Sequence, residues 1–141
     1  MSVQVLEARL TSAEISVAAL ATQVASDSCG AVVTFSGNVR NLDKGKEVAT
    51  LNYEIHPSTE AILQEVTNEV ANRYASIRCS VIHRYGQIPI GESALAIAVA
   101  TPHRADAFRA CAELVDEIKN RIPIWKHQIF IDGSDEWVNC A

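Results

Sequence analysis

The sequence predicts an α+β fold in a single domain, residues 1–141, with a mostly antiparallel, mixed sheet and two to three packed helices. Segments of helical and strand periodicity follow one another in a mixed order, unlike the regular alternation that builds a parallel sheet. The chain of 141 residues is 48% hydrophobic, which is enough for one core. It has no repeat, low-complexity tract or Pro/Gly/Ser-rich linker that would mark a domain boundary.

The first third of the chain predicts one helix and one strand. A Thr-Ser-Ala-Glu sequence at 11–14 has the spacing of a capping box and predicts a first helix, which ends near Val24. Residues 31–36 predict a strand, and the Gly-Asn pair that follows should end it. Arg40 is then expected on a loop at the end of that strand, ahead of an exposed turn at 43–45.

The middle of the chain predicts a second helix among three strands. Residues 48–55, 77–81 and 93–100 are strand-like, and the last of these shows no alternation, which favours a strand covered on both faces. A helix should begin at 57. Its apolar stripe recurs at nearly every fourth position: Ile62, Val66, Val70 and Tyr74.

The last part predicts a third helix and a final strand. The helix should begin after Arg104 and continue to Asn120, with Lys119 on its last turn. Its expected apolar stripe is Phe108, Cys111, Leu114, Val115 and Ile118. Residues 127–131 predict a short strand, and the Trp-Val pair at 137–138 a closing apolar contact.

Bulk composition narrows the function classes. A net charge of −5 disfavours nonspecific nucleic-acid binding, which needs surplus Lys and Arg. The longest apolar run is too short to span a bilayer, and the N-terminus does not resemble a signal peptide. The four cysteines are widely spaced without a CxxC pair, so reduced thiols in a cytoplasmic protein are expected, with Cys140 the most exposed.

Two lysines are the strongest candidates for chemistry. Lys119 and Lys126 flank a Pro-Ile-Trp segment at 123–125, an unusual place for an amine unless it is held in a cleft. Two neighbouring amines lower each other's pKa toward acid, base or nucleophile behaviour, and Arg40 or Arg104 nearby would add to this effect. The plainer alternative is a favourable helix-end cation and a solvated strand-end charge.

Histidines supply the remaining candidates. His103 and Arg104 precede a helix, whose N-terminal N–H groups favour an anion, so a phosphate or carboxylate site is plausible there; the alternative is surface solvation. His83 with Arg84 predicts a hydrogen-bonded turn. A zinc site built from His83, His103 and His127 with an acidic residue has no supporting spacing, and no nucleotide-binding or serine-hydrolase motif is present.

Several of these segments together resemble a known family, the large, catalytic subunit of molybdopterin synthase. The matching sequences lie in the same order at 30–41, 82–86 with 91–92, 103–104 with 107–108, Lys119 with 123–126, and 137–138. The resemblance implies a sulfurtransferase of molybdenum cofactor biosynthesis that converts cyclic pyranopterin monophosphate, a pterin substrate, to molybdopterin. It also implies that no cofactor or metal is required.

The resemblance further implies partners and residue roles. A small ubiquitin-like sulfur-carrier subunit should deliver sulfur as a thiocarboxylate on its C-terminal Gly-Gly tail, with the large subunit forming a homodimer inside a heterotetramer. Lys119 and Lys126 would be catalytic. The expected substrate-binding residues are Asn38, Val39, Arg40, His103, Arg104, His127 and Gln128, with His103 and Arg104 acting from the neighbouring subunit.

Three departures from the family pattern keep an alternative open. Gln128 stands where an acidic residue is common, the usual methionine after 53–54 is not evident, and the sequence ends at 141 without the basic residue that some relatives use. A catalytically silent scaffold that keeps the partner-tail groove is therefore the alternative. Retention of the cationic residues favours the enzyme.

Overall fold

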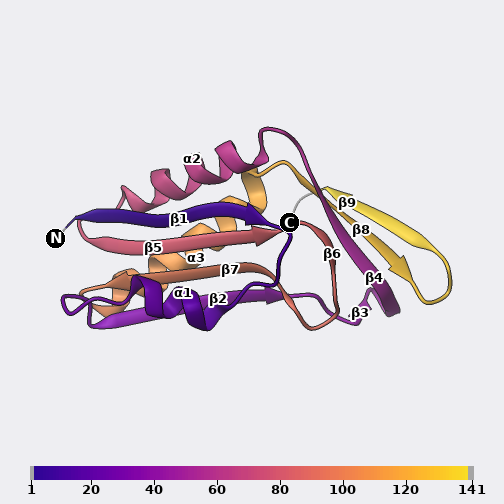
Figure 1. Ribbon diagram of the computed structural model, residues 1–141, viewed down its shortest axis with the longest axis horizontal. Coiled ribbons are helices and arrows are strands. Elements are labelled where there is room, and N and C mark those ends of the chain that lie inside the picture. Colours follow the sequence, from indigo (N-terminus) through magenta and orange to yellow (C-terminus); the bar gives the residue numbers. More distant parts are fainter. Residues whose placement is uncertain (1, 140–141) are drawn as a thin grey trace.

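A four-stranded and a five-stranded β-sheet meet end to end in this protein, and three helices pack on the four-stranded sheet (Figure 1). The structure is a computed structural model that describes residues 2–139. The four-stranded sheet has the order β1 (Val3–Thr11), β5 (Ile77–Arg84), β7 (Ser93–Thr101) and β2 (Ala31–Asn38). Only the β1–β5 pair within it is parallel. The predicted α+β class with a mostly antiparallel sheet is confirmed.

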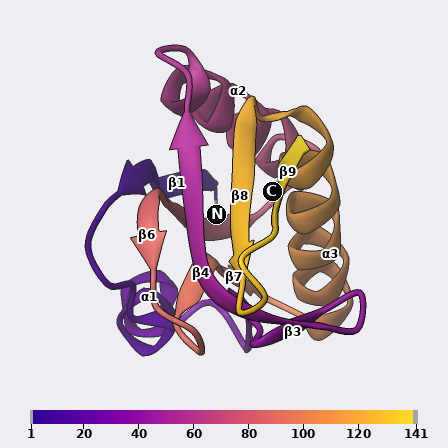
Figure 2. The same ribbon diagram turned by 90° about the vertical axis from the view of Figure 1, so that its right-hand side faces the viewer.

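The second sheet is antiparallel throughout the described residues and lies beyond one end of the first. Figure 2 shows its long central strand β4 (Lys46–Ile55) between β6 (Gly86–Ile88) and β8 (Ile124–Phe130). The remaining strands, β3 (Leu42–Asp43) and β9 (Asp135–Asn139), pair with β4 and β8 respectively. Lys44 and Gly45, both with positive φ, form the two-residue turn from β3 to β4.

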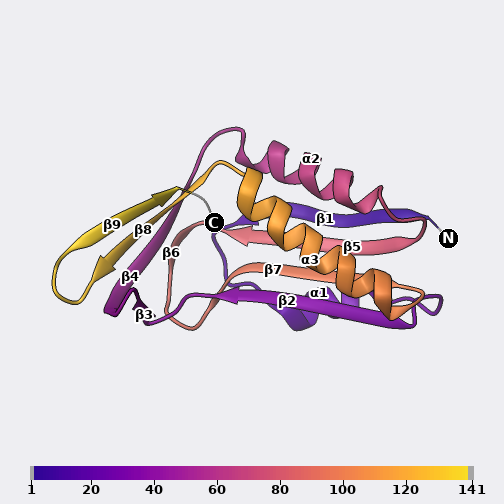
Figure 3. The same cartoon turned by 180° about the vertical axis from the view of Figure 1, so that it is seen from behind.

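The three helices are divided between the two faces of the four-stranded sheet. Figure 3 shows α2 (Thr59–Ala71) and α3 (Arg104–Arg121) side by side on one face, whereas α1 (Val17–Val24) lies on the other. The described helices include none long and apolar enough to cross a membrane.

The central strand β7 is buried along its whole length, as its lack of alternation predicts. Its larger side chains, Leu95, Ile97 and Val99, belong to the main core under α2 and α3. The second cluster is built around Leu20 and Val24 of α1, and the strand residues that face it are Ala96, Ala98 and Ala100. Small side chains on that face let the short helix pack closely on the strand.

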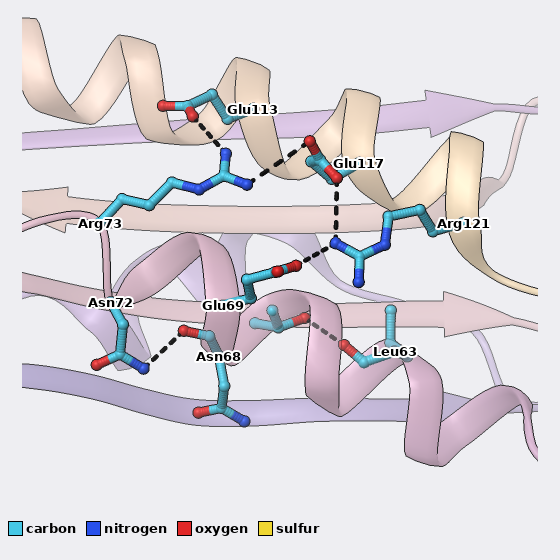
Figure 4. A network of polar contacts seen from close by, with 9 residues as sticks. Leu63, Asn68, Glu69, Asn72, Arg73, Glu113, Glu117 and Arg121 are labelled. Carbon is cyan, nitrogen blue, oxygen red and sulfur yellow. Dashed lines mark hydrogen bonds and ion pairs between the residues drawn. The ribbon is translucent and has the colours of Figure 1, made fainter.

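Ion pairs connect α2 and α3 at the surface (Figure 4). Arg73, just beyond α2, contacts Glu113 at 2.7 Å and Glu117 at 3.7 Å. Arg121 pairs with Glu117 at 3.2 Å and with Glu69 of α2. Such exposed pairs contribute little each, so the buried apolar stripes hold the two helices together.

The N-terminal part departs from the prediction in two respects. Residues 3–11 form β1, an unpredicted strand whose parallel partner β5 lies about 70 residues further along the chain. The predicted capping box at 11–14 is wrong, because Thr11 ends β1 and its hydroxyl accepts from the Ala13 amide. The cap of α1 is Ser16, whose hydroxyl accepts from the Ala19 amide at 3.1 Å.

Other corrections concern faces and boundaries. Phe108 does not belong to the buried stripe of α3, since it is 62% exposed; the buried positions are Ala107, Ala110, Cys111, Leu114 and Ile118. His83 and Arg84 lie in strand β5 and not in a turn. The last predicted strand begins earlier, at Ile124, and the 137–138 pair belongs to β9.

Two cysteines behave as small core hydrophobes. Burial raises the pKa of the Cys79 thiol to about 12 and that of Cys111 to about 11, so both stay protonated. Cys29 is half-buried. Cys140 lies outside the described residues.

Candidate functional site

A small cavity of about 170 Å³ lies where the two sheets and α3 meet. Its polar lining comes from five segments that are distant in sequence: Asn38, Arg40, Tyr53, His83, Lys119 and Lys126. Val39 also lines it. Five predicted site residues, from Asn38 to Arg40 and the two lysines, are therefore brought together.

The two lysines line the same cavity because the chain reverses direction between them. Lys119 is on the last turn of α3, and the Ile122 amide closes that helix by donating to the Ile118 carbonyl at 3.1 Å. The chain then enters β8, where Lys126 is in register with Tyr53 of β4. Both amines consequently approach the cavity from different elements.

Arg40 is presented by a loop with a fixed backbone. The Val39 amide donates to the Glu92 carbonyl at 3.0 Å, and the Val39 carbonyl accepts from the Gly91 amide at 2.8 Å. The Arg40 side chain is 76% exposed and lies 3.5 Å from Asp43. The exposed Arg40 guanidinium therefore lies at the rim of the cavity that Lys119 and Lys126 also line.

Gln128 lies outside the cavity and forms a hydrogen bond with Asp43. It is 2% exposed, and its side-chain amide donates to Asp43 at 2.7 Å. This hydrogen bond, with Lys126 and Arg40 adding smaller electrostatic effects, lowers the pKa of Asp43. Gln128 shares a strand face with Lys126 but contacts a neighbouring carboxylate, and it does not line the cavity.

Sequence reasoning did not place two polar residues of the cavity, Tyr53 and His83, in the site, and His83 is the less exposed of the two. Its side chain is fully buried, and its Nδ1 lies 2.8 Å from the Arg84 carbonyl. The ring meets Tyr53 edge to face, with centroids 5.1 Å apart. Burial lowers the pKa of His83 to about 4, and nearby Lys119 adds to the lowering, so the imidazole is neutral. The alternation of buried Cys79 and Val81 on the same strand could have indicated its inward direction.

His103 and Arg104 lie far from this cavity in the same chain. They begin α3, whereas Lys119 ends it, and 15 residues of helix span about 22 Å. They line a separate hollow of about 500 Å³ with Gly30 and Pro102. Within one chain the predicted anion site and the lysine site are therefore separate.

His127 faces away from the cavity. Because side chains alternate along a strand, it lies on the opposite face of β8 from Lys126. Its ring stacks on Trp137 with centroids 4.2 Å apart, and its Nε2 lies 2.9 Å from Asp135. The structure thus gives His127 neighbours in β9, not in the cavity.

Two further observations concern alternative sites. A larger hollow of about 480 Å³ lies beside α1. Of its charged residues, Glu7 and Arg9 pair at 2.7 Å and Glu14 adds a second carboxylate, and none of the predicted site residues line it. Within residues 2–139, no group of three His, Cys, Asp or Glu side chains is placed to hold a metal ion.

Comparison with known protein families shows which family this chain belongs to. Residues 10–121 match the family model described as MoaE protein. The chain belongs to the MoaE family.

Individual relatives agree with this assignment. The molybdopterin synthase catalytic subunit of Halalkalibacterium halodurans is 41% identical over 82% of this chain and 74% of its own length. The crystal structure of molybdopterin synthase from Staphylococcus aureus is 33% identical, with a TM-score of 0.85 over 92% of this chain and 94% of that one. A complex of subunits 1 and 2 of the Helicobacter pylori molybdopterin-converting factor, 18% identical with a TM-score of 0.62, shares the fold.

Membership of the MoaE family confirms the resemblance and the sulfurtransferase class inferred from sequence. In this MoaE-family chain the matched region includes every lining residue of the cavity except Lys126, which lies beyond residue 121.

Proposed function

We propose that the cavity at the junction of the sheets is the sulfur-transfer site, where a thiocarboxylate attacks a side-chain carbon of cyclic pyranopterin monophosphate on the way to molybdopterin. The observation that carries this proposal is the convergence of Lys119 and Lys126 on one small cavity with Arg40 at its rim. Negative charge builds on oxygen during the attack, and a phosphate ester is displaced or opened. Clustered cations stabilise both charges.

The two lysines have complementary roles in this proposal. Lys126 comes from a strand whose register with Tyr53 fixes its position, so it suits electrostatic stabilisation of the developing oxyanion. Lys119 lies on the last helical turn beside His83, and as an amine in a partly enclosed cavity it suits proton transfer. Asn38, Val39 and Arg40 supply a further part of the cavity lining, from the end of β2 and the residues that follow it.

The donor is a small ubiquitin-like subunit with a thiocarboxylated Gly-Gly tail. The cavity is narrow, about 170 Å³, and a tail without side chains can enter such a space by main-chain hydrogen bonds alone. The relatives are named as catalytic subunits, which supports a second, separate subunit as the sulfur source.

His103 and Arg104 bind the anionic end of the substrate from a second copy of the chain. The long span of α3 prevents them from reaching the cavity of their own chain, so their participation requires a homodimer. Both side chains are exposed at the helix start, beside N–H groups that favour anions.

The test is molybdopterin formation from the pterin precursor and thiocarboxylated small subunit. The Lys119→Ala and Lys126→Ala variants should each lose product formation by roughly 100-fold or more while keeping fold and partner binding. Lys44→Ala is the matched control, since that lysine is exposed and pairs with Glu136 outside the cavity. Equal activity of all three variants would contradict the proposal.

One feature favours the scaffold alternative: Gln128 supplies a neutral amide, committed to Asp43, at a position where the family resemblance implies an acidic residue. Tight partner binding by the unaltered protein without any product would establish that alternative. Product formation would exclude it.

A further inference from the structure

The hydrogen bond of His83 to the Arg84 carbonyl fixes the tautomer of its ring. A carbonyl oxygen can only accept, so Nδ1, 2.8 Å away, carries the proton. The ring is neutral, because burial lowers its pKa to about 4. In a neutral imidazole protonated at Nδ1, the other nitrogen, Nε2, presents a lone pair and acts only as an acceptor.

That acceptor is buried and has no hydrogen-bond partner within residues 2–139. Leaving a buried polar atom unpaired costs free energy, so such atoms are uncommon and require an explanation. His83 lines the cavity, and the edge-to-face contact with Tyr53 holds the ring in place. The fold therefore keeps a buried, unsatisfied acceptor on a residue that belongs to the lining of the site.

The other polar groups of the cavity show what this acceptor adds. Arg40, Lys119 and Lys126 can only donate when charged. The Asn38 side-chain oxygen already accepts from the Ser36 hydroxyl at 2.6 Å, and the Tyr53 hydroxyl can donate as well as accept. Charged donors recognise the anionic part of a substrate, but a ring that carries N–H groups also needs acceptors.

We propose that His83 is a substrate-positioning residue whose Nε2 accepts a hydrogen bond from an N–H group of the nitrogen heterocycle bound between Lys119 and Lys126. This inference rests on the proposed function of the cavity and deepens it, since it assigns the contact that orients the ring. Among anionic ligands, it selects those with an N–H donor: a site that hydrogen-bonds a polar group rejects analogues lacking that group, because its own buried partner is then left unpaired.

Two substitutions separate this role from a structural one. In His83→Asn the side-chain amide nitrogen can replace Nδ1 and keep the bond to the Arg84 carbonyl, but the acceptor at the Nε2 position is lost. In His83→Gln the side-chain oxygen can reach the Nε2 position and restore the acceptor, but the bond to Arg84 is lost. A positioning role therefore predicts damage from asparagine and rescue by glutamine, and a purely structural role predicts the reverse.

The measurement is the Kd of cyclic pyranopterin monophosphate for the full chain by calorimetry, with no sulfur donor present. His83→Asn should weaken binding about tenfold, as expected for one lost hydrogen bond, and His83→Gln should bind within about threefold of the unaltered protein. Equal affinities, or a larger loss for glutamine than for asparagine, would overturn the inference. Circular dichroism of both variants verifies the fold.

A second measurement avoids substitution altogether. In the unaltered protein labelled with ¹⁵N-histidine, the Nε2 resonance of His83 should move upfield, in the direction of an accepted hydrogen bond, when the pterin substrate is added. No movement at saturating substrate would overturn the inference. If the unaltered protein makes molybdopterin while the His83 predictions fail, only this inference is wrong; if it neither binds the precursor nor makes product, the proposed function fails as well.

Discussion

Replacing His83 with asparagine should remove a pH dependence from the stability of this protein. The His83 side chain is fully buried, and its pKa in the folded protein is about 4, against 6.5 for an ordinary histidine. Between these two values the unfolded chain binds a proton that the folded protein does not. The free energy of unfolding therefore falls as pH falls from about 6.5 to about 4, and the fall then levels off.

The size of the effect follows from the two pKa values. Their difference, multiplied by 1.36 kcal/mol for each pH unit, gives roughly 3 kcal/mol of stability that is present at pH 7 and lost by pH 4. This is a large share of the 5–15 kcal/mol that is typical of a folded domain. Carboxylates such as Asp43 also titrate in acid, so the quantity to compare is the difference between unaltered protein and variant.

Urea unfolding followed by circular dichroism at half-unit steps from pH 7.5 to 4 measures that difference. The stability of the unaltered protein relative to His83→Asn should decline by roughly 3 kcal/mol over this range. His56→Gln, at an exposed histidine, controls for the removal of an imidazole as such. A constant difference between the unaltered protein and His83→Asn would refute the reasoning, because the buried ring would then titrate as it does in the unfolded chain.

Three further substitutions test one hydrogen bond beside the site and the packing elsewhere in the fold, each by urea unfolding at pH 7. Gln128→Glu should cost roughly 1–3 kcal/mol, since it removes the donor to the partly buried Asp43 and places a buried carboxylate beside it. Asp43→Asn in the same chain should restore most of that loss. Leu63→Ala should cost roughly 2–5 kcal/mol because it empties a fully buried position of α2. Gly30→Ala should cost about 1–3 kcal/mol, because the added Cβ would lie 2.8 Å from the Pro102 carbonyl oxygen ahead of α3.

Controls exist for each of these changes. Ile62→Ala, at a partly buried neighbour on the same helix, should cost less than the change at Leu63, and equal costs would contradict the assigned face of α2. For Gln128→Glu, failure of the Asp43→Asn partner change to restore stability would show that carboxylate repulsion is not the cause. A neutral Gly30→Ala would mean that the backbone near Pro102 can move away.

The site was predictable where a single element determines a residue's position. Helical periodicity placed Lys119 on the last turn of α3, and turn chemistry placed Arg40 on the loop after β2. Absence of alternation predicted the burial of β7 on both faces. Phe108 was assigned to the wrong face because its position is only one residue from the true stripe, and an aromatic residue suggested burial.

Residues whose role depends on long-range pairing were not predictable in this way. His83 looked like part of a turn because the strand that pairs with β5 in parallel, β1, carries a weak pattern of its own. Arg104 was considered as a neighbour of the two lysines, but within one chain the length of α3 separates it from Lys119. His127 and Lys126 are adjacent in sequence and yet face opposite sides of β8.

The sequence by itself determined the α+β class, most of the helices and strands, the family resemblance and the choice of Lys119 and Lys126 as candidate site residues. Local periodicity and unusual motifs are sufficient for these predictions, because they depend only on residues that are close together in the chain. Only the tertiary structure decided that Asn38, Tyr53, His83 and both lysines line one cavity. It also decided that an imidazole acceptor lies unpaired in the wall of that cavity. The physical reason is that strand register and the meeting of two sheets depend on contacts between distant segments, which no local pattern encodes.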